Sequence, residues 1–204
     1  MEGPLAHALR PFPGGRTDAP IAFLDRDGVL NQSLDGYVNQ PRELHLIPGT
    51  ARAMRKLRDE GYLICVVTNQ SAIGRGLWDD ERLHQIHDRL DEILFGEGAQ
   101  PDLVLACPHL PWAGCGCRKP KAGMLSLGAS LLRSEQGFGV LRERMQPIEE
   151  AQAHPADLMV GDRRTDVMAG LAYGARTFRP PRDVGLEPWM NRLLDVNDAG
   201  NGVN

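Results

Sequence analysis

The sequence predicts an α/β fold, in which helices cover both faces of a doubly wound, Rossmann-like parallel sheet. Three observations predict it. Short apolar runs alternate with segments of helical pattern along most of the chain. The apolar runs are continuous over about four to six residues, which is typical of strands buried on both faces. Polar residues follow directly after four of these runs, at the edge where folds of this class bind their ligands.

The expected elements alternate between strand and helix. Strands are expected over residues 21–25, 62–69, 102–107, 157–162 and 175–179, and helices over residues 49–61, 79–96, 122–134 and 164–174. Asp79 is a favoured N-cap residue, and Gly61 and Gly96 are favoured where helices end. The alternation itself predicts parallel strands joined by crossover helices.

A single folded domain is expected over residues 21–180, because the composition is that of an ordinary globular chain. The chain has 204 residues, of which 42% are hydrophobic and 25% are charged. Residues 1–20 are rich in Pro and Gly without periodicity and predict a flexible leader. Residues 181–204 are expected to be a C-terminal tail. The polar residues 134–156, interrupted by Pro147, are expected to form a surface excursion.

The charge balance argues against several classes of partner. A net charge of -4 and a pI near 5.9 give no general attraction to nucleic acid or anionic lipid. No apolar run approaches the roughly 20 residues that cross a bilayer, and the N-terminus lacks a basic leader. We therefore expect a cytoplasmic monomer without nucleic-acid or membrane partners.

Carboxylates follow two of the predicted strands. Asp25 and Asp27 follow the apolar residues that begin the stretch IAFLDRDGVLN, and Asp162 and Asp166 follow the fourth strand. Such an oxygen-rich pocket suits a hard cation such as Mg²⁺. Beside the cation, Asp25 could attack phosphorus to form an aspartyl-phosphate, and Asp27 could act as general acid and then base. Asp166 ranks below Asp162, because it more simply stabilises the first turn of its helix.

Donors follow the other two strands. Thr68 and Asn69 end the second strand, and Arg118 and Lys119 follow the third. The Thr68 hydroxyl and the Lys119 ammonium could hold the oxygens of a transferred phosphoryl group. Taken alone, the first pair could be a helix cap and the second pair ordinary surface charge.

A cluster of sulfur and nitrogen ligands precedes the basic pair. Cys107, His109, Cys115 and Cys117 form the pattern C-x-H-x5-C-x-C, the ligand set of a closed tetrahedral zinc site. Four protein ligands leave no open position for catalysis, so the expected role of Zn²⁺ is to fix the two basic residues that follow. Cys65 lies within an apolar run and is expected to be buried. His84 and His87 could chelate a metal, but we expect them on a solvated helix face.

The motifs DRDGVLN, VVTNQ, CRKP and GDRRTD, in this order, resemble the four signature motifs of the haloacid dehalogenase superfamily of phosphatases. The resemblance covers roughly residues 20–180 and implies a phosphatase domain without a large cap domain. It implies that Asp25 is the nucleophile and Asp27 the general acid and base. It also implies Mg²⁺ bound by Asp25, the backbone carbonyl of Asp27 and Asp162, phosphoryl contacts from Thr68 and Lys119, and substrate recognition by Arg118.

Within the superfamily, GYV, TNQSAIGRG and CGCRKPKAGM resemble the D-glycero-D-manno-heptose 1,7-bisphosphate 7-phosphatases. The short loop LPWAG between the ligand pairs is closer to the related histidinol-phosphate phosphatases. We expect a phosphoric monoester hydrolase of carbohydrate metabolism that removes the 7-phosphate of the heptose bisphosphate or acts on a similar small phosphorylated metabolite. Histidinol phosphate is the alternative substrate. Residues 31–44 would form a flap, with substrate contacts from Tyr37, Asn69 and Arg75.

Two alternatives of other kinds stay open. A nucleic-acid end phosphatase shares the first motif, but the acidic balance argues against it. A catalytically inactive, zinc-stabilised binding module is also possible. The intact acids Asp25 and Asp27 argue against that interpretation.

Overall fold

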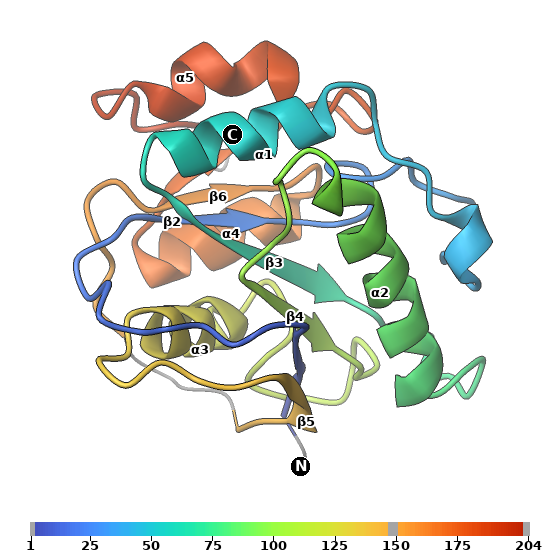
Figure 1. Ribbon diagram of the computed structural model, residues 1–204. Helices are drawn as coiled ribbons and strands as arrows, with labels where there is room; N and C mark the ends of the chain where they lie inside the picture. Colours follow the sequence, from blue (N-terminus) through green and yellow to red (C-terminus); the bar gives the residue numbers. More distant parts are fainter. Residues whose placement is uncertain (1–2, 147–150, 202–204) are drawn as a thin grey trace.

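The computed structural model describes residues 3–146 and 151–201, which form an α/β fold around one seven-stranded sheet (Figure 1). The strand order is β5-β1-β4-β3-β2-β6-β7. The strands are β1 Leu5–Ala8, β2 Ile21–Leu24, β3 Leu63–Asn69, β4 Leu103–Cys107, β5 Leu141–Arg144, β6 Leu158–Val160 and β7 Arg176–Phe178. The strands from β4 to β7 in this order are parallel, as predicted, whereas β1 runs antiparallel to both of its neighbours.

Helices cover both faces of the sheet and bury two separate apolar clusters. The helices are α1 Thr50–Asp59, α2 Asp80–Phe95, α3 Gly123–Leu132, α4 Arg164–Tyr173 and α5 Met190–Leu194, with the 3-10 helices η1 Pro41–Glu43 and η2 Glu187–Trp189. Alternate residues of β2 enter different clusters. Phe23 packs with residues of α3 and α4, and Leu24 packs with residues of α1, α2 and α5. Both faces of this strand are therefore buried, which explains its continuous apolar sequence.

Local signals in the sequence agree with the helix boundaries. The Asp79 side chain accepts a hydrogen bond from the backbone N–H of Arg82, as expected for the N-cap of α2. The segment between β2 and α1 contains only the short helix η1, in agreement with the absence of a large cap domain. None of the described helices is long and apolar enough to span a membrane.

The expectation of a flexible leader is wrong for Leu5–Ala8. These residues are buried and form β1, which pairs with both β4 and β5. The polar segment 134–156 likewise contributes Leu141–Arg144, the edge strand β5. Each strand is only four residues long, and its pairing partners are remote in sequence, so no local pattern marks it. Pro147, which was expected to interrupt this segment, lies outside the described residues.

The C-terminal region is also part of the fold. Helix α5 lies within residues 181–204, which were expected to be a tail. Leu186, Met190 and Leu193 are buried in the same cluster as α1 and α2. Figure 1 shows α5 and α1 lying side by side above the sheet. Apolar burial therefore holds this segment, although its sequence carries few apolar residues.

Candidate active site

Asp25 directly follows β2, the middle strand of the parallel part of the sheet, and is 6% exposed. One oxygen, Oδ1, lies 2.8 Å from Nζ of Lys119 and accepts a hydrogen bond from the backbone N–H of Arg26 at 2.9 Å. Burial raises the pKa of Asp25 to about 7, and the Lys119 ammonium opposes this increase. The carboxylate is thus a buried base whose charged form depends on a neighbouring cation.

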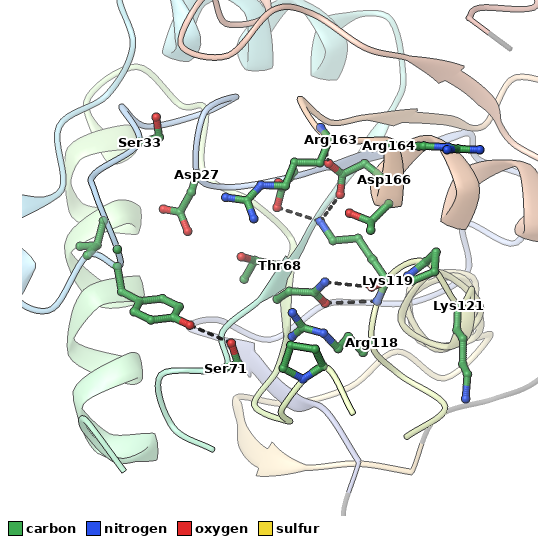
Figure 2. Close-up of a pocket in the computed structure, with 18 of the residues that line it drawn as sticks. Asp27, Ser33, Thr68, Ser71, Arg118, Lys119, Lys121, Arg163, Arg164 and Asp166 are labelled. Carbon is green, nitrogen blue, oxygen red and sulfur yellow. Dashed lines mark hydrogen bonds and ion pairs between the residues drawn. The ribbon is translucent and has the colours of Figure 1, made fainter. Parts of the chain in front are cut away.

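Lys119 connects two buried carboxylates. Its Nζ atom lies 2.7 Å from Oδ1 of Asp166 and 2.8 Å from Oδ1 of Asp25, and it donates to the carbonyl of Val67 at 2.7 Å (Figure 2). Burial would lower the pKa of Lys119, but Asp166 and Asp25 outweigh it and raise this pKa. Asn69 fixes the backbone of Lys119, accepting from its N–H at 3.2 Å and donating to its carbonyl at 3.1 Å.

Asp27 lines the same cavity and accepts hydrogen bonds from three side chains. Asn31 donates to Oδ1 at 3.0 Å, Gln70 donates to Oδ2 at 2.9 Å, and Arg26 contacts both oxygens. Gln70 also donates to the Thr68 hydroxyl at 2.8 Å. Burial would raise the pKa of Asp27, but Arg26 and the hydrogen bonds from Asn31 and Gln70 outweigh it, so the pKa is lowered. Arg26, Asn31 and Gln70 were not identified from the sequence.

Three carboxylates at this edge of the sheet could hold a cation. One oxygen each of Asp25, Asp162 and Asp166 lies within 4.8 Å of the others. Oδ1 of Asp162 is buried and accepts no hydrogen bond, although Nε of Arg163 lies 3.9 Å from it. Burial, and to a smaller extent the nearby charge of Asp166, raise the pKa of Asp162. The backbone of Gly28 lies close against this carboxylate. A Cβ atom at Gly28, where φ is +86°, would lie 2.9 Å from Oδ2 of Asp162, too close for the carboxylate to keep its position. The all-oxygen donor set, and an Asp162 oxygen that accepts no hydrogen bond, fit Mg²⁺.

Asp166 has more contacts than the sequence suggested. Its Oδ2 accepts from the backbone N–H of Arg163 at 2.9 Å, which is the expected role in the first turn of α4. The same carboxylate also forms the ion pair with Lys119 and is 1% exposed. Its rank below Asp162 therefore understated its part in the site.

A cavity of about 670 Å³ opens over these residues, large enough for a small metabolite. Asp25, Asp27, Thr68, Asn69 and Lys119 all line it, so the predicted residues of separate strands meet in one place. The lining is strongly cationic and also includes Arg75, Arg118, Lys121, Arg163, Arg164 and Arg182. Figure 2 shows several of these basic side chains around the cavity. This surplus of positive charge suits a ligand with more than one negative group.

The flap closes one side of the cavity. The Tyr37 hydroxyl lies 2.8 Å from the hydroxyl of Ser71 and accepts a hydrogen bond from Nε of Arg75 at 3.2 Å. The Arg75 guanidinium lies 5.9 Å from the ring centroid of Trp112, in the loop between the metal-ligand pairs. Tyr37 and Arg75, both predicted as substrate contacts, therefore join the flap to the loop that follows β3.

The four sulfur and nitrogen ligands meet after β4, as their spacing predicts. Sγ of Cys107 lies 3.4 Å from Sγ of Cys117, 3.7 Å from Sγ of Cys115 and 3.5 Å from Nδ1 of His109. A tetrahedron with zinc–sulfur bonds of about 2.3 Å has edges of about 3.8 Å, so these separations fit Zn²⁺. The hydrogen bond from Cys117 lowers the pKa of Cys107 to about 5, which makes one thiolate available. Arg118 is tied to this loop because its Nη1 donates to the carbonyl of His109 at 3.1 Å.

The expectation that His84 and His87 lie on a solvated helix face is wrong. Both are buried, 6% and 3% exposed, against His7 of β1. The face of α2 that carries them is covered by a strand that the sequence did not predict. The burial of His84 and His87 therefore could not be predicted from the sequence.

Known proteins resemble this chain over most of its length, although no family model matches it. A D-glycero-beta-D-manno-heptose-1,7-bisphosphate 7-phosphatase of Pseudomonas aeruginosa is 43% identical over 166 residues, which cover 81% of this chain and 89% of the relative. The protein of the same name from Photorhabdus laumondii is 41% identical over 200 residues, covering 90% and 96%. The crystal structure of D,D-heptose 1,7-bisphosphate phosphatase from B. bronchiseptica, complexed with magnesium and phosphate, matches with a TM-score of 0.64 and 32% identity. That match covers 78% of this chain and 79% of the other.

Proposed function

The chain belongs to the family of D-glycero-beta-D-manno-heptose-1,7-bisphosphate 7-phosphatases, and we propose that it hydrolyses the 7-phosphate ester of that sugar bisphosphate. The observation that carries the proposal is the contact of 2.8 Å between Asp25 and Lys119, beside a group of carboxylates that fits Mg²⁺. A buried carboxylate at the floor of a cationic cavity can reach a phosphate that it would otherwise repel.

In the first step, an oxygen of Asp25 attacks phosphorus and the bond from phosphorus to the sugar oxygen breaks. The aspartyl-phosphate forms on Asp25, and the sugar oxygen takes a proton from the carboxyl group of Asp27. The Thr68 hydroxyl and the Lys119 ammonium contact the phosphoryl oxygens, where negative charge is greatest. Thr68 is 1% exposed and hydrogen-bonded to Gln70, so its hydroxyl needs little reorganisation.

In the second step, water attacks the phosphorus of the aspartyl-phosphate. Asp27 accepts a proton from this water, inorganic phosphate leaves, and the carboxylate of Asp25 is restored. The lowered pKa of Asp27 favours this second step, because its ionised form accepts the proton, and it makes the protonated form that the first step uses the minor form.

Mg²⁺ would be held by Asp25, the backbone carbonyl of Asp27 and Asp162. When bound, it supplies positive charge that reduces the repulsion between the substrate phosphate and the carboxylates. Asp166 contributes differently, since its ion pair fixes Lys119 at 2.7 Å. Zn²⁺ on Cys107, His109, Cys115 and Cys117 would stiffen the loop that carries Arg118 and Lys119.

Recognition of the remaining phosphate is proposed to fall to basic residues of the cavity wall. Arg118 is held by the metal-ligand loop and Arg75 by Tyr37. Tyr37 belongs to the flap and Arg118 to the loop that carries the metal ligands, so a bisphosphate would be contacted by residues of two separate segments. Asn69 also lines the cavity, but both polar atoms of its side chain contact the backbone of Lys119, so it positions that residue.

We propose that the protein acts as a cytoplasmic monomer, which gel filtration and cell fractionation would test.

The substrate is tested by kcat/KM for the β and α anomers of the heptose 1,7-bisphosphate, histidinol phosphate and a panel of sugar monophosphates. The proposal expects the β-bisphosphate to exceed every monophosphate, because the second phosphate meets the cationic wall. A higher kcat/KM for histidinol phosphate would replace the proposed substrate while leaving the phosphatase chemistry intact. The short LPWAG loop makes that comparison worthwhile.

A further inference from the structure

Arg26 is a fully buried cation beside the active site. Its side chain is 0% exposed, the largest side chain that is fully buried among the described residues. A guanidinium withdrawn from water is tolerated when it is paired and hydrogen-bonded. Among the described residues, the carboxylate that pairs with it is that of Asp27, the next residue in the chain. The buried guanidinium of Arg26 thus contacts Asp27, the residue that donates and accepts protons in the proposed reaction.

The contact between these neighbours is forked. Nε of Arg26 donates to Oδ1 of Asp27 at 3.1 Å, and Nη2 donates to Oδ2 at 2.9 Å. Two parallel hydrogen bonds from a planar guanidinium fix the plane of a carboxylate, which a single donor does not. The backbone N–H of Arg26 also donates to Oδ1 of Asp25 at 2.9 Å. One residue therefore contacts both acids of the proposed mechanism.

The guanidinium of Arg26 also contacts a residue of α2, on the side away from Asp27. Nη1 of Arg26 lies 3.4 Å from Nε2 of His87, which is 3% exposed. Burial, and then the charge of Arg26, keep the pKa of His87 well below its ordinary value, so the neutral ring can accept this hydrogen bond. The ring of His7 from β1 lies behind it, with 5.4 Å between the centroids. The guanidinium is thus enclosed between the carboxylate and a buried ring.

The other donors to Asp27 are neutral amides. Asn31 donates to Oδ1 and Gln70 to Oδ2, and each also donates to a second acceptor. They complete the hydrogen bonding of the carboxylate, but only Arg26 contacts both of its oxygens with a rigid fork. Asp27 and Thr68 face the same cavity in Figure 2. The buried guanidinium of Arg26 therefore determines how the Asp27 carboxylate is oriented toward the cavity, where the reacting phosphate would bind.

We propose that Arg26 is a positioning residue, which holds the Asp27 carboxylate in the plane from which it protonates the leaving oxygen, and that His87 holds Arg26 in turn. The proposal rests on the proposed phosphatase function. It differs from a purely structural role for Arg26, because it concerns one chemical step. Protonation matters when the leaving group is a sugar oxygen, which would otherwise depart as an alkoxide. It hardly matters for a leaving group that departs as a stable anion.

The test compares leaving groups in the Arg26→Lys variant, which keeps the charge but loses the fork. kcat/KM is measured for the heptose bisphosphate, p-nitrophenyl phosphate and acetyl phosphate, since this constant reports the steps up to departure of the leaving group. The ratio between substrates is independent of the fraction of active protein, so partial misfolding does not distort it. Arg176→Lys is the matched control, because Arg176 is a buried arginine remote from the cavity.

The expected result is a loss of roughly 10²–10⁴-fold in kcat/KM for the sugar phosphate, with losses within about tenfold for the two activated substrates. His87→Gln should shift the ratio in the same direction by a smaller factor, and Arg176→Lys should leave it unchanged. If Arg26→Lys does not fold, His87→Gln carries the test.

Equal losses for all substrates would overturn the proposal, because they indicate a structural role only. A gain with the sugar phosphate would also overturn it, since Arg26 would then be holding Asp27 away from the substrate. An unchanged ratio in His87→Gln would remove His87 from the proposal, and would overturn it if that variant alone folds. If the wild-type protein hydrolyses none of the three substrates, the proposed function itself fails, an outcome distinct from these.

Discussion

Nζ of Lys119 lies 2.8 Å from Oδ1 of Asp25, and both side chains are withdrawn from water. Burial raises the pKa of Asp25 to about 7 even though this ammonium favours the ionised carboxylate. A nucleophile must be ionised to attack phosphorus. The cation at Lys119 therefore supports the nucleophile in addition to any contact with the substrate.

Replacing the nucleophile should abolish turnover without unfolding the chain. Asp25→Asn keeps the shape of the side chain, so the fold should persist, but the amide cannot form the aspartyl-phosphate. We expect kcat to fall by more than about 10³-fold, measured as inorganic phosphate released from the heptose bisphosphate. Asp59→Asn is the control, because Asp59 is an exposed residue of α1. Activity retained in Asp25→Asn would exclude the mechanism proposed above.

Removing Lys119 should reduce both stability and activity. Lys119→Met leaves two buried carboxylates without their cation, and breaking a buried pair costs about 3–5 kcal/mol. The loss in free energy of unfolding should be larger at pH 8 than at pH 5. The reason is that without Lys119 the pKa of Asp25 rises further above its wild-type value of about 7. At pH 5 Asp25 is mostly protonated in both folded proteins, so the two proteins differ through this group only at pH values above about 7.

Urea unfolding at the two pH values measures this difference, and phosphate release measures the activity. Lys56→Met is the matched control, since Lys56 is an exposed lysine of α1 that does not line the cavity. Equal losses at both pH values would show that the ion pair with Asp25 does not account for the instability.

The residues that could be predicted from the sequence are those whose position follows from the end of a strand. Asp25 and Thr68 lie at the ends of apolar runs, Lys119 follows the cluster of metal ligands after β4, and parallel strands bring their carboxyl ends together. The spacing from Cys107 to Cys117 was equally informative, because a zinc site needs four ligands close together. Local pattern and a simple topological rule were sufficient for this part.

Residues whose role depends on packing between remote segments could not be predicted. Arg26 is an unremarkable charge in the sequence, and its burial depends on α2 and on β1, a strand of four residues without a clear pattern. Arg182 lines the cavity although it lies in a segment expected to be a tail. The sequence carries no signal for such contacts, because they arise only when the whole fold is assembled.

Loss of the zinc site should lower activity through the residues that follow it. Cys117→Ala removes one of four ligands next to Arg118, so zinc content should fall from about one per chain to a small fraction. Displacement of the adjacent basic residues should reduce kcat/KM on the order of 10²-fold. Metal analysis by mass spectrometry and phosphate release provide the two measurements. Cys65→Ala, at a buried cysteine outside the cluster, should leave zinc content unchanged; full activity in a zinc-free Cys117→Ala protein would contradict this role.

Acid should destabilise the fold through His7. Burial, reinforced by His84 and Arg142, lowers the pKa of His7 to about 3, although its Nε2 lies 3.2 Å from Oδ1 of Asp88. Below the ordinary pKa of 6.5 the unfolded chain takes up a proton that the folded chain refuses, so the free energy of unfolding falls as pH decreases. For His7 alone, the slope of the free energy of unfolding against pH approaches about 1.4 kcal/mol per pH unit as the pH falls from 6 to 4.

The His7→Gln variant should lose this contribution, because glutamine does not titrate. Its free energy of unfolding, measured with urea by circular dichroism from pH 7.5 to pH 4.5, should depend on pH less steeply than that of the wild type by about 1 kcal/mol per unit. His45→Gln is the control, since His45 is exposed and its replacement should leave the wild-type slope. The carboxylates titrate in all three proteins, so their common contribution cancels in the comparison. Parallel pH profiles for His7→Gln and the wild type would mean that the buried imidazole is protonated in the folded chain, with Asp88 as its counter-ion.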